Sequence, residues 1–304
     1  MSHAKVLRDL LNAPGVIVAP GMYDAFTSLL IEQHGFKCAY LGGASISYTR
    51  IAQPDIGLTS VSEVAQVVSH IRERITIPFI VDADTGFGNA LNTQRTVKLL
   101  ERMGASGIQL EDQTYPKRCG HLAGKTLVSK EEMVGKLKAA VDARADRNTV
   151  IVGRTDAIAV EGFEKAVERA HAYVEAGADV LFIEAPQTTE QMQSLGKMFA
   201  GRAPLLANMV EGGKTPLKSA AELGDLGFKL VIFPGAMVRV VAHAASEYLN
   251  ILQSDGSTAR MRNRMFDFAQ VNAILGLDGI MADGQKYDPG LAAATESSVH
   301  KKSR

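Results

Sequence analysis

The sequence predicts an α/β fold of the (β/α)8 barrel class, also known as the TIM barrel. Eight short apolar runs rich in Val, Ile and Leu follow one another along the chain, and helical patterns separate them. Such runs are typical of parallel strands that are buried on both faces. Eight of these strands, alternating with helices over about 250 residues, are what a closed barrel requires.

The expected strands fall into two groups. In the first, a helix ends at a glycine and an apolar run begins within a few residues, because glycine tolerates the left-handed backbone that caps a helix. These helix and strand steps lie at residues 31–43, 100–112, 174–186 and 221–234. The other four strands are expected at residues 16–20, 78–84, 149–156 and 203–209.

The remaining segments are predicted to be helices and a tail. Residues 163–176 place Val167, Ala170 and Val174 on one face, as expected of a helix that covers a sheet. Residues 236–283 predict further helices, and the polar residues 284–304 predict a flexible tail. We expect residues 1–304 to form a single barrel domain with these additions.

An open doubly wound sheet is the main alternative, and its nucleotide-binding motifs are incomplete here. The run "GFGNAL" has Leu91 where a dinucleotide-binding fingerprint needs its third glycine. The run "MVEGGKTP" follows Asn208, which stands where a P-loop needs its first glycine. The sequence therefore indicates no organic cofactor.

Charge and composition favour small-molecule chemistry. The 304 residues carry 33 basic and 33 acidic side chains without a long run of either sign, so we expect neither a nucleic-acid partner nor a membrane surface. The N-terminus lacks the apolar core of a signal peptide, and no apolar run reaches membrane-spanning length. These features predict a cytoplasmic protein. Its two cysteines are too few for a disulfide framework.

Acidic residues collect where barrel enzymes have their active sites, at the carboxyl ends of the strands. Asp82 and Asp84 are two residues apart and are expected on one face of a strand. Glu111 and Glu184 end two other strands. Converging carboxylates repel one another unless a cation lies among them, and oxygen-only ligands indicate Mg²⁺ or Mn²⁺. Two further acids, Asp112 and Asp156, are alternatively expected to cap the helices that follow them.

A cationic residue and a cysteine loop complete the predicted site. Arg154 ends the fifth strand and is expected to bind a substrate carboxylate, unless it only pairs with a barrel acid. Cys119 follows the fourth strand in "TYPKRCGHLAGK", with Lys117, Arg118 and His121 beside it. Cationic neighbours stabilise a thiolate, so we expect an acidic thiol available for proton transfer, with an inert loop thiol as the alternative. The other cysteine, Cys38, is expected to be a core residue.

Five motifs resemble those of the isocitrate lyase and phosphoenolpyruvate mutase superfamily. They are "VDADTGFG", "IQLEDQ", "KRCGH", "GRTDA" and "FIEAP", and the resemblance covers nearly the whole chain. The run "KRCGH" followed by "VSKEEM" is similar to the 2-methylisocitrate and 2,3-dimethylmalate lyases. The resemblance implies a barrel, Mg²⁺, a lid loop that carries the cysteine, and a homotetramer of dimers that exchange a C-terminal helix.

The resemblance also implies roles for individual residues. Asp82 and Asp84 match the metal-site aspartates, with Asp55 and Glu111 in an outer shell that holds metal-bound waters. The lyases usually have a serine at the position of Gly42. Ser45 is the candidate to supply the missing hydroxyl to the substrate. Arg262 matches an arginine from the exchanged helix. The remaining substrate-binding positions are matched by Tyr40, Gly42, Gly43, Arg154, Glu184 and Asn208.

These parts predict an Mg²⁺-dependent carbon–carbon lyase that acts on a substituted 2-hydroxy di- or tricarboxylate. Cleavage would give pyruvate and an enolate of a second acid, which Cys119 protonates. The candidate substrates are 2-methylisocitrate, for whose third carboxylate Arg262 or Lys214 is a candidate partner, and 2,3-dimethylmalate, and the sequence slightly favours the first. The alternatives are an oxaloacetate decarboxylase, a phosphonopyruvate-type enzyme that cleaves or forms a carbon–phosphorus bond, and a barrel without catalytic activity.

Overall fold

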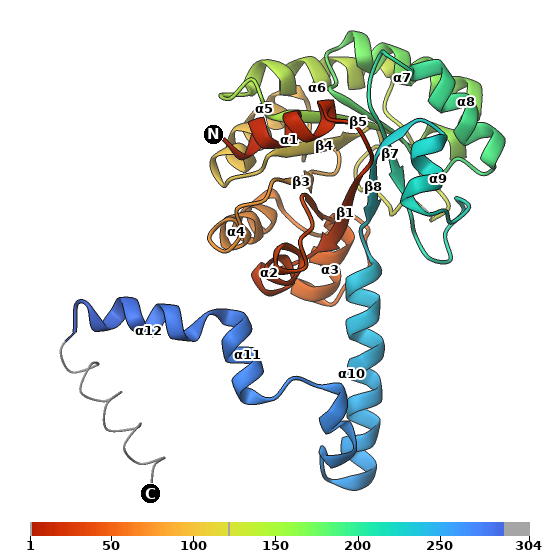
Figure 1. Ribbon diagram of the computed structural model, residues 1–304. Coiled ribbons are helices and arrows are strands. Elements are labelled where there is room, and N and C mark those ends of the chain that lie inside the picture. The colour runs from red at the N-terminus through yellow and green to blue at the C-terminus, as the bar shows by residue number, and fades with distance from the viewer. Residues whose placement is uncertain (1, 121, 289–304) are drawn as a thin grey trace, which may run out of the picture. The chain divides into compact units, whose positions relative to one another are not determined.

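The computed structural model describes residues 2–120 and 122–288, and its centre is a closed barrel of eight parallel strands (Figure 1). Each strand pairs with the next along the chain, and β8 closes the barrel against β1. This confirms the predicted fold class. The strands are β1 (Ile17–Met22), β2 (Ala39–Leu41), β3 (Phe79–Asp82), β4 (Gly107–Glu111), β5 (Val150–Thr155), β6 (Val180–Ile183), β7 (Leu205–Asn208) and β8 (Phe228–Phe233).

Helices connect the strands, and most begin at a polar residue whose side chain accepts a hydrogen bond from the first turn. Ser60, Ser219 and Asp24 each form such a cap reciprocally with the residue three positions later. The helices of the barrel are α1 (His3–Asn12), α2 (Ala25–Gln33), α3 (Gly43–Ile51), α4 (Val61–Arg72), α5 (Ala90–Arg102), α6 (Lys130–Ala143), the 3₁₀ turn η1 (Ala157–Ala159), α7 (Phe163–Glu175), α8 (Thr189–Phe199) and α9 (Ala220–Asp225).

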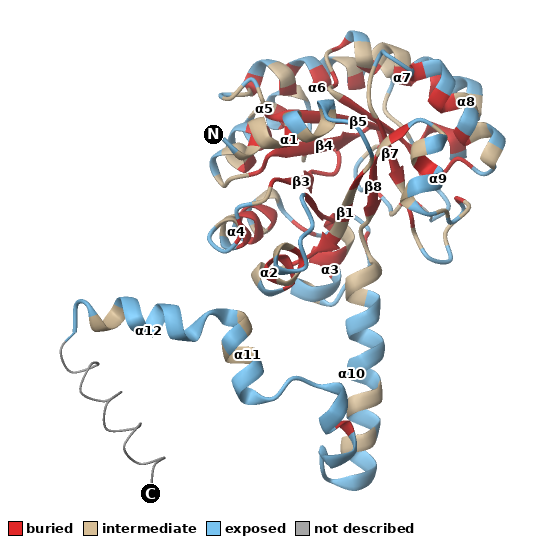
Figure 2. Ribbon diagram, viewed as in Figure 1, coloured by how far each residue is buried: buried red, intermediate tan, exposed pale blue. Residues whose placement is uncertain are grey.

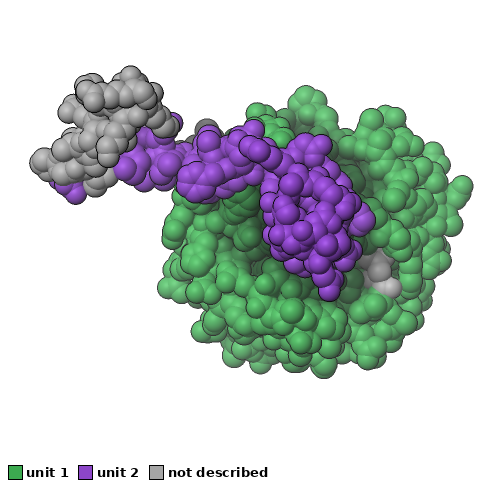
Figure 3. All heavy atoms as spheres, turned by 90° about the horizontal axis from the view of Figure 1, so that it is seen from below, with its two compact units in different colours: residues 1–240 green, residues 241–304 purple. Residues whose placement is uncertain are grey.

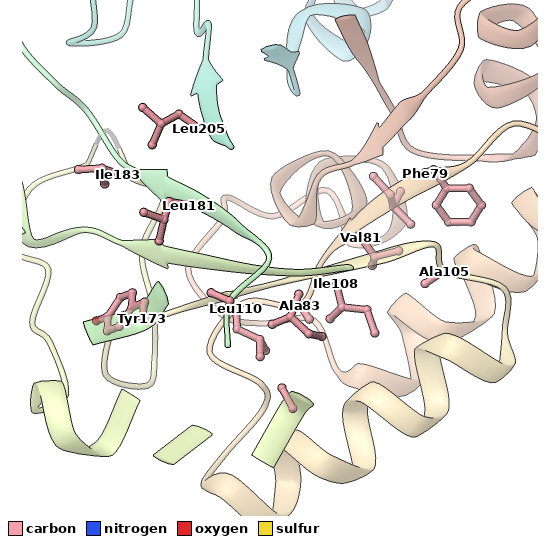
Figure 4. Close-up of a cluster of buried hydrophobic side chains, with 14 of the residues drawn as sticks. Phe79, Val81, Ala83, Ala105, Ile108, Leu110, Tyr173, Leu181, Ile183 and Leu205 are labelled. Atoms are coloured by element: carbon pink, nitrogen blue, oxygen red, sulfur yellow. The ribbon is translucent and has the colours of Figure 1, made fainter. Parts of the chain in front are cut away.

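The strand alternation divides the apolar side chains between two sides of the barrel wall. One set, including Ile80, Val152 and Phe182, fills the barrel interior together with Leu7 of α1. The other set packs between the strands and the surrounding helices, and Figure 4 shows part of it, including Val81, Leu110 and Leu181. Figure 2 shows the result, a buried sheet within helices that are buried on one face. The strands are apolar on both faces because the interior covers one face and the helices cover the other.

Of two sequence predictions about packing, one is confirmed and the other differs in detail. Cys38 is fully buried in the barrel interior, as expected, and burial raises the pKa of its thiol to about 12. In α7, Val167 and Ala170 are buried as predicted, but Tyr173 takes the buried place assigned to Val174. Tyr173 is the better anchor because its hydroxyl reaches a buried carboxylate at the end of β4, that of Asp112.

The chain divides into two compact units at residue 240, which Figure 3 colours separately. Helix α10 (Ala236–Asp255) spans the division, and the second unit continues with the 3₁₀ turn η2 (Ala259–Arg264), α11 (Phe268–Leu275) and α12 (Leu277–Gln285). These are the additional C-terminal helices that the sequence predicts. Residues 289–304 of the predicted tail lie outside the described residues. Across residues 2–120 and 122–288, every helix is too short or too polar to span a bilayer.

Candidate active site

The carboxyl ends of the strands form a pocket whose lining follows from strand alternation. Ile80, Val152 and Phe182 point into the barrel, so the residues two positions later, Asp82, Arg154 and Glu184, point into its mouth. The pocket encloses about 610 Å³ of empty space, part of it open to solvent. The predicted residues that line it are Tyr40, Gly42, Gly43, Asp55, Asp82, Lys117, Arg118, Cys119, Arg154, Glu184 and Asn208.

Asp82 and Asp84 converge in a different way from the one expected. Strand β3 ends at Asp82, and Asp84 follows in a turn with a left-handed φ of 47°. The backbone N–H of Asp84 donates to Oδ1 of Asp82 at 3.2 Å, so the turn holds one carboxylate against the backbone of the other. The two side chains meet through this turn and not through two positions of one strand.

Lys117 lies among the predicted metal-site carboxylates. Its ammonium is 2.5 Å from Oδ1 of Asp55 and 2.8 Å from Oδ1 of Asp84, and the side chain is almost fully buried. Burial alone lowers the pKa of Lys117, but the charges of Asp84 and Asp55 outweigh it and raise this pKa well above its usual value. Lys117 therefore neutralises these acids and keeps its proton.

Negative charge still accumulates in the mouth. Burial, together with the nearby charges of Asp82 and Asp55, raises the pKa of Asp84 to about 6 even though Lys117 lowers it. Burial and the charges of Asp156 and Asp82 raise the pKa of Glu111 well above its usual value. Carboxyl groups with raised pKa values indicate a site that gains from an additional cation.

The geometry around Gly43 fits a hard divalent cation. Oδ1 of Asp84 is buried against the Lys117 ammonium, and a Cβ at position 43 would lie 3.1 Å from this oxygen and 3.5 Å from Oδ2 of Asp82. Glycine thus leaves a small space between two carboxylate oxygens. Within residues 2–120 and 122–288, no three His, Cys, Asp or Glu side chains are placed to chelate an ion together. Mg²⁺ suits such a site because it binds one or two carboxylates and keeps several other oxygen ligands.

Arg154 is held by acids on three sides. Its Nε donates to Oδ2 of Asp156 at 2.8 Å and lies 3.3 Å from Oε2 of Glu111, while Nη2 lies 3.8 Å from Oε1 of Glu184. Glu111 and Arg154 are register partners on β4 and β5, which explains their contact. The guanidinium also stacks over the ring of Phe182 at 4.9 Å. Arg154 is therefore both a paired barrel cation and a lining residue of the pocket.

The two acids assigned to helix capping have other roles. Asp112 follows Glu111 and points outward, where its carboxylate accepts hydrogen bonds from Tyr173 at 2.6 Å and from Thr155 at 2.7 Å. Asp156 pairs with Arg154 and, at 2.7 Å, with Lys125. Neither side chain caps a helix, because each is occupied by buried partners.

The Cys119 loop lies against the pocket. The backbone N–H of Cys119 donates to the carbonyl of Asp55 at 3.1 Å, and Gln113 bonds both the backbone of Arg118 and Oε1 of Glu111. At Gly120 the backbone comes so close that a Cβ would overlap Oε1 of Glu184 and lie 2.5 Å from Nη2 of Arg154. A side chain at position 120 would force the ends of the Glu184 and Arg154 side chains, or the loop itself, to move.

The remaining predicted residues differ in how close they lie to the pocket. The Arg118 guanidinium donates to the carbonyl of Ala123 at 3.0 Å, and the Tyr40 hydroxyl donates to Oε1 of Gln109 at 3.0 Å. The Ser45 hydroxyl donates to the carbonyl of Pro234, and Ser45 is not a lining residue of the pocket. His121 lies outside the described residues, and Arg262 is an exposed residue of the second unit.

Sequence reasoning missed three residues around the pocket. Tyr48 and Arg239 line it, and Lys125 lies behind the Cys119 loop. Neither Tyr48 nor Arg239 was matched to a motif of the superfamily, and the fold brings both to the mouth. Lys125 closes the "HLAGK" run, but its partner Asp156 is distant in sequence.

Known proteins share this chain's sequence over most of its length. The phosphoenolpyruvate phosphomutase family matches residues 7–252. A 2,3-dimethylmalate lyase from Eubacterium barkeri is 43% identical over 290 residues, which cover 95% of this chain and 100% of the relative. A 2-methylisocitrate lyase from Aeropyrum pernix is 44% identical over 301 residues, which cover 98% of this chain and 95% of the relative.

Solved structures share the fold. The crystal structure of a 2,3-dimethylmalate lyase has a TM-score of 0.89 at 35% identity, with 94% of this chain and 96% of that chain covered. A phosphonopyruvate hydrolase in complex with oxalate and Mg²⁺ has a TM-score of 0.85 at 31% identity, with 94% and 99% covered. The predicted resemblance to this superfamily is thereby confirmed.

Proposed function

This chain belongs to the phosphoenolpyruvate phosphomutase family and is an enzyme of the carbon–carbon lyase type, and from this premise we propose that it cleaves a substituted 2-hydroxy di- or tricarboxylate to pyruvate and a second carboxylic acid. One observation carries the proposal: a single pocket is lined by Asp82, Arg154 and Glu184 from separate strands and by Cys119 from a loop. Such a pocket combines acid, cation and thiol groups around one substrate.

Asp82 and Asp84 are the residues that would hold Mg²⁺, with Mn²⁺ as the alternative ion. When bound, the ion supplies positive charge that stabilises negative charge on the substrate oxygens. Asp55 and Glu111 support this site from the sides, Asp55 by fixing Lys117 and Glu111 by contacting Arg154. The carboxylates of Asp82 and Asp84 both face the small space beside Gly43.

Arg154 would orient the substrate through a carboxylate. Its position between Glu111, Asp156 and Glu184 fixes the guanidinium plane, and fixed donors are effective because they need no reorganisation during the reaction. Asn208 donates to Oε1 of Glu184 at 3.3 Å and leaves its own Oδ1 buried without a partner. That oxygen is a candidate acceptor for a substrate hydroxyl.

Cys119 would be the proton donor. Once the substrate 2-hydroxyl loses its proton, the adjacent carbon–carbon bond breaks, pyruvate leaves as one product and the electron pair passes to the enolate of the second acid. The thiol then gives its proton to the enolate carbon. A carboxylate that lines the pocket, such as that of Glu184, would accept the hydroxyl proton and return it to the thiolate sulfur. Proton transfer from a positioned group contributes roughly 10²- to 10⁴-fold in rate.

The pocket supports a tricarboxylate as the first choice of substrate. Arg239 lines it, so a cation lies near the mouth for a third carboxylate, although its guanidinium also pairs with Glu211 at 2.5 Å. Lys214 lies in the exposed β7–α9 loop, and the assignment of Arg262 stays a prediction. We therefore place 2-methylisocitrate before 2,3-dimethylmalate.

A substrate panel tests the proposal. Pyruvate release is measured from 2-methylisocitrate, 2,3-dimethylmalate and oxaloacetate with Mg²⁺, with Mn²⁺ and with a chelator. We expect metal-dependent release from the first two substrates. Carbon dioxide released from oxaloacetate would instead indicate the decarboxylase.

Phosphonopyruvate is the second candidate substrate, because a phosphonopyruvate hydrolase is among the structural neighbours at 31% identity. The same metal ligands and Arg154 would serve a carbon–phosphorus substrate, but the thiol would have no role. Phosphate release from phosphonopyruvate, without pyruvate release from the substituted malates, would favour this alternative.

We also propose a homotetramer built through the C-terminal helices, in a cytoplasmic enzyme. The second unit exposes large apolar side chains, among them Phe266, Phe268 and Ile280. Exposed apolar groups of this kind are typical of interaction surfaces. Light scattering of the full chain and of a Phe268→Ser variant tests this: a tetramer that weakens in the variant supports the proposal, and a monomeric wild type contradicts it.

A further inference from the structure

Lys125 is a buried lysine behind the Cys119 loop. Its ammonium donates to Oδ1 of Asp156 at 2.7 Å and to the backbone carbonyl of Gly120, and the residue is only 7% exposed. A buried ammonium costs free energy unless its charge is paired and its protons are used in hydrogen bonds. The two contacts satisfy that requirement, and both lead toward the pocket.

Gly120 is the residue through which Lys125 acts on the loop. It follows Cys119 directly and lies in close contact with Glu184 and Arg154, since a methyl group in place of its hydrogen would overlap those side chains. Holding the Gly120 carbonyl therefore determines how far the Cys119 backbone stands from both side chains.

Asp156 connects this loop contact to Arg154. One of its oxygens, Oδ2, accepts from Nε of Arg154 at 2.8 Å, while Oδ1 accepts from Lys125. The backbone N–H of Asp156 donates to Asp112 at 2.9 Å, which fixes the carboxylate to the barrel wall. A single anchored carboxylate thus orients the guanidinium in the pocket and the lysine that holds the loop.

We propose that Lys125 is a positioning residue that holds the Cys119–Gly120 backbone over Arg154 and Glu184. The Asp156 carboxylate, which binds both Lys125 and Arg154, fixes the position of the loop relative to the guanidinium. The inference rests on the proposed function, because it places a proton donor. Lys125 acts through Gly120 and does not itself touch the substrate.

The test compares Lys125→Met with Lys138→Met, the same change at an exposed lysine of α6. Two quantities are measured: kcat and KM for pyruvate release, and the rate at which iodoacetamide alkylates Cys119, followed by mass spectrometry. Cys38 is fully buried and serves as the unreactive internal reference. We expect kcat to fall by about 10²-fold with little change in KM, because a small displacement of a reacting group has that effect. Cys119 should be alkylated several-fold faster, and Lys125→Arg should restore much of both properties.

Wild-type kcat and wild-type alkylation in a folded Lys125→Met protein would overturn the proposal, even if its melting temperature fell. If Lys125→Met does not fold, Lys125→Gln, which removes the charge and shortens the side chain, is measured against the same expectations. The alkylation rate needs no substrate. Failure of the lyase assignment, seen as a wild type without pyruvate release, is therefore distinguishable from failure of the positioning role.

Discussion

The ammonium of Lys117 lies 2.8 Å from Oδ1 of Asp84, inside the group of acids predicted to bind a metal. This pair, with Asp55 as a second partner, gives the site a fixed positive charge before any ion binds. Lys117, which the sequence singles out as a neighbour of Cys119, also pairs with these carboxylates.

Replacement of Lys117 by Met should destabilise the metal-free protein. Removing one partner from a buried ion pair leaves uncompensated charge on Asp55 and Asp84, and such losses are about 3 to 5 kcal/mol. Added Mg²⁺ should restore more unfolding free energy to the variant than to the wild type. Urea unfolding with and without Mg²⁺ measures both effects, and equal Mg²⁺ effects in the two proteins would contradict this account.

The stability of the metal-free protein should depend on pH between about 4 and 6. The pKa of Asp84 is raised to about 6 in the folded state, so the folded protein holds a proton that the unfolded chain releases. The proton on Asp84 therefore adds to the unfolding free energy. This stabilisation is fully present below the unfolded pKa of Asp84 and is lost as the pH rises through 6. Its size is on the order of 3 kcal/mol.

Mg²⁺ should show the opposite dependence, because it binds the ionised carboxylate. The rise in melting temperature on adding Mg²⁺ should grow as the pH increases from 4 to 6. Thermal unfolding across this range measures both trends. In Asp84→Asn, the pH dependence of metal-free stability and the pH dependence of the Mg²⁺ effect should both become smaller. If both are unchanged in this variant, another group is responsible.

Replacement of Cys119 by Ser should lower kcat by roughly 10²- to 10⁴-fold, since a hydroxyl is a much weaker acid than a thiol. Pyruvate and Mg²⁺ binding should be preserved, as isothermal titration would show. The control is Cys38→Ala, which changes a buried interior residue and should leave turnover intact. Near-native activity in Cys119→Ser would rule out the proton-donor role.

Replacement of Gly120 by Ala should lower kcat/KM by about 10²-fold, because the added methyl group would push the loop away from Glu184 and Arg154. The matched control is Gly135→Ala within α6, where a Cβ meets nothing within 4 Å. That change should keep activity and add about 0.5–1 kcal/mol to the unfolding free energy. Circular dichroism and steady-state kinetics distinguish the two variants, and equal activities would show that the loop has room to adjust.

The barrel could be predicted from the sequence because its signals are local. Glycine at helix ends, buried apolar runs and two-residue alternation act within a few residues, so they placed Asp82, Arg154 and Glu184 at the mouth. The same strand pattern placed Asn208, and the resemblance to the superfamily added Tyr40; both also line the pocket.

Contacts between distant segments were decided only by the tertiary structure. The left-handed turn at Asp84, the outward direction of Asp112 and the ion pair of Lys125 with Asp156 depend on neighbours that strand pairing and helix packing bring together. Burial then decides which of these charges are paired and which pKa values move, because desolvation depends on the whole surrounding fold. The chain's local pattern determined where the chemical groups are, and the folded barrel determined what each of them contacts.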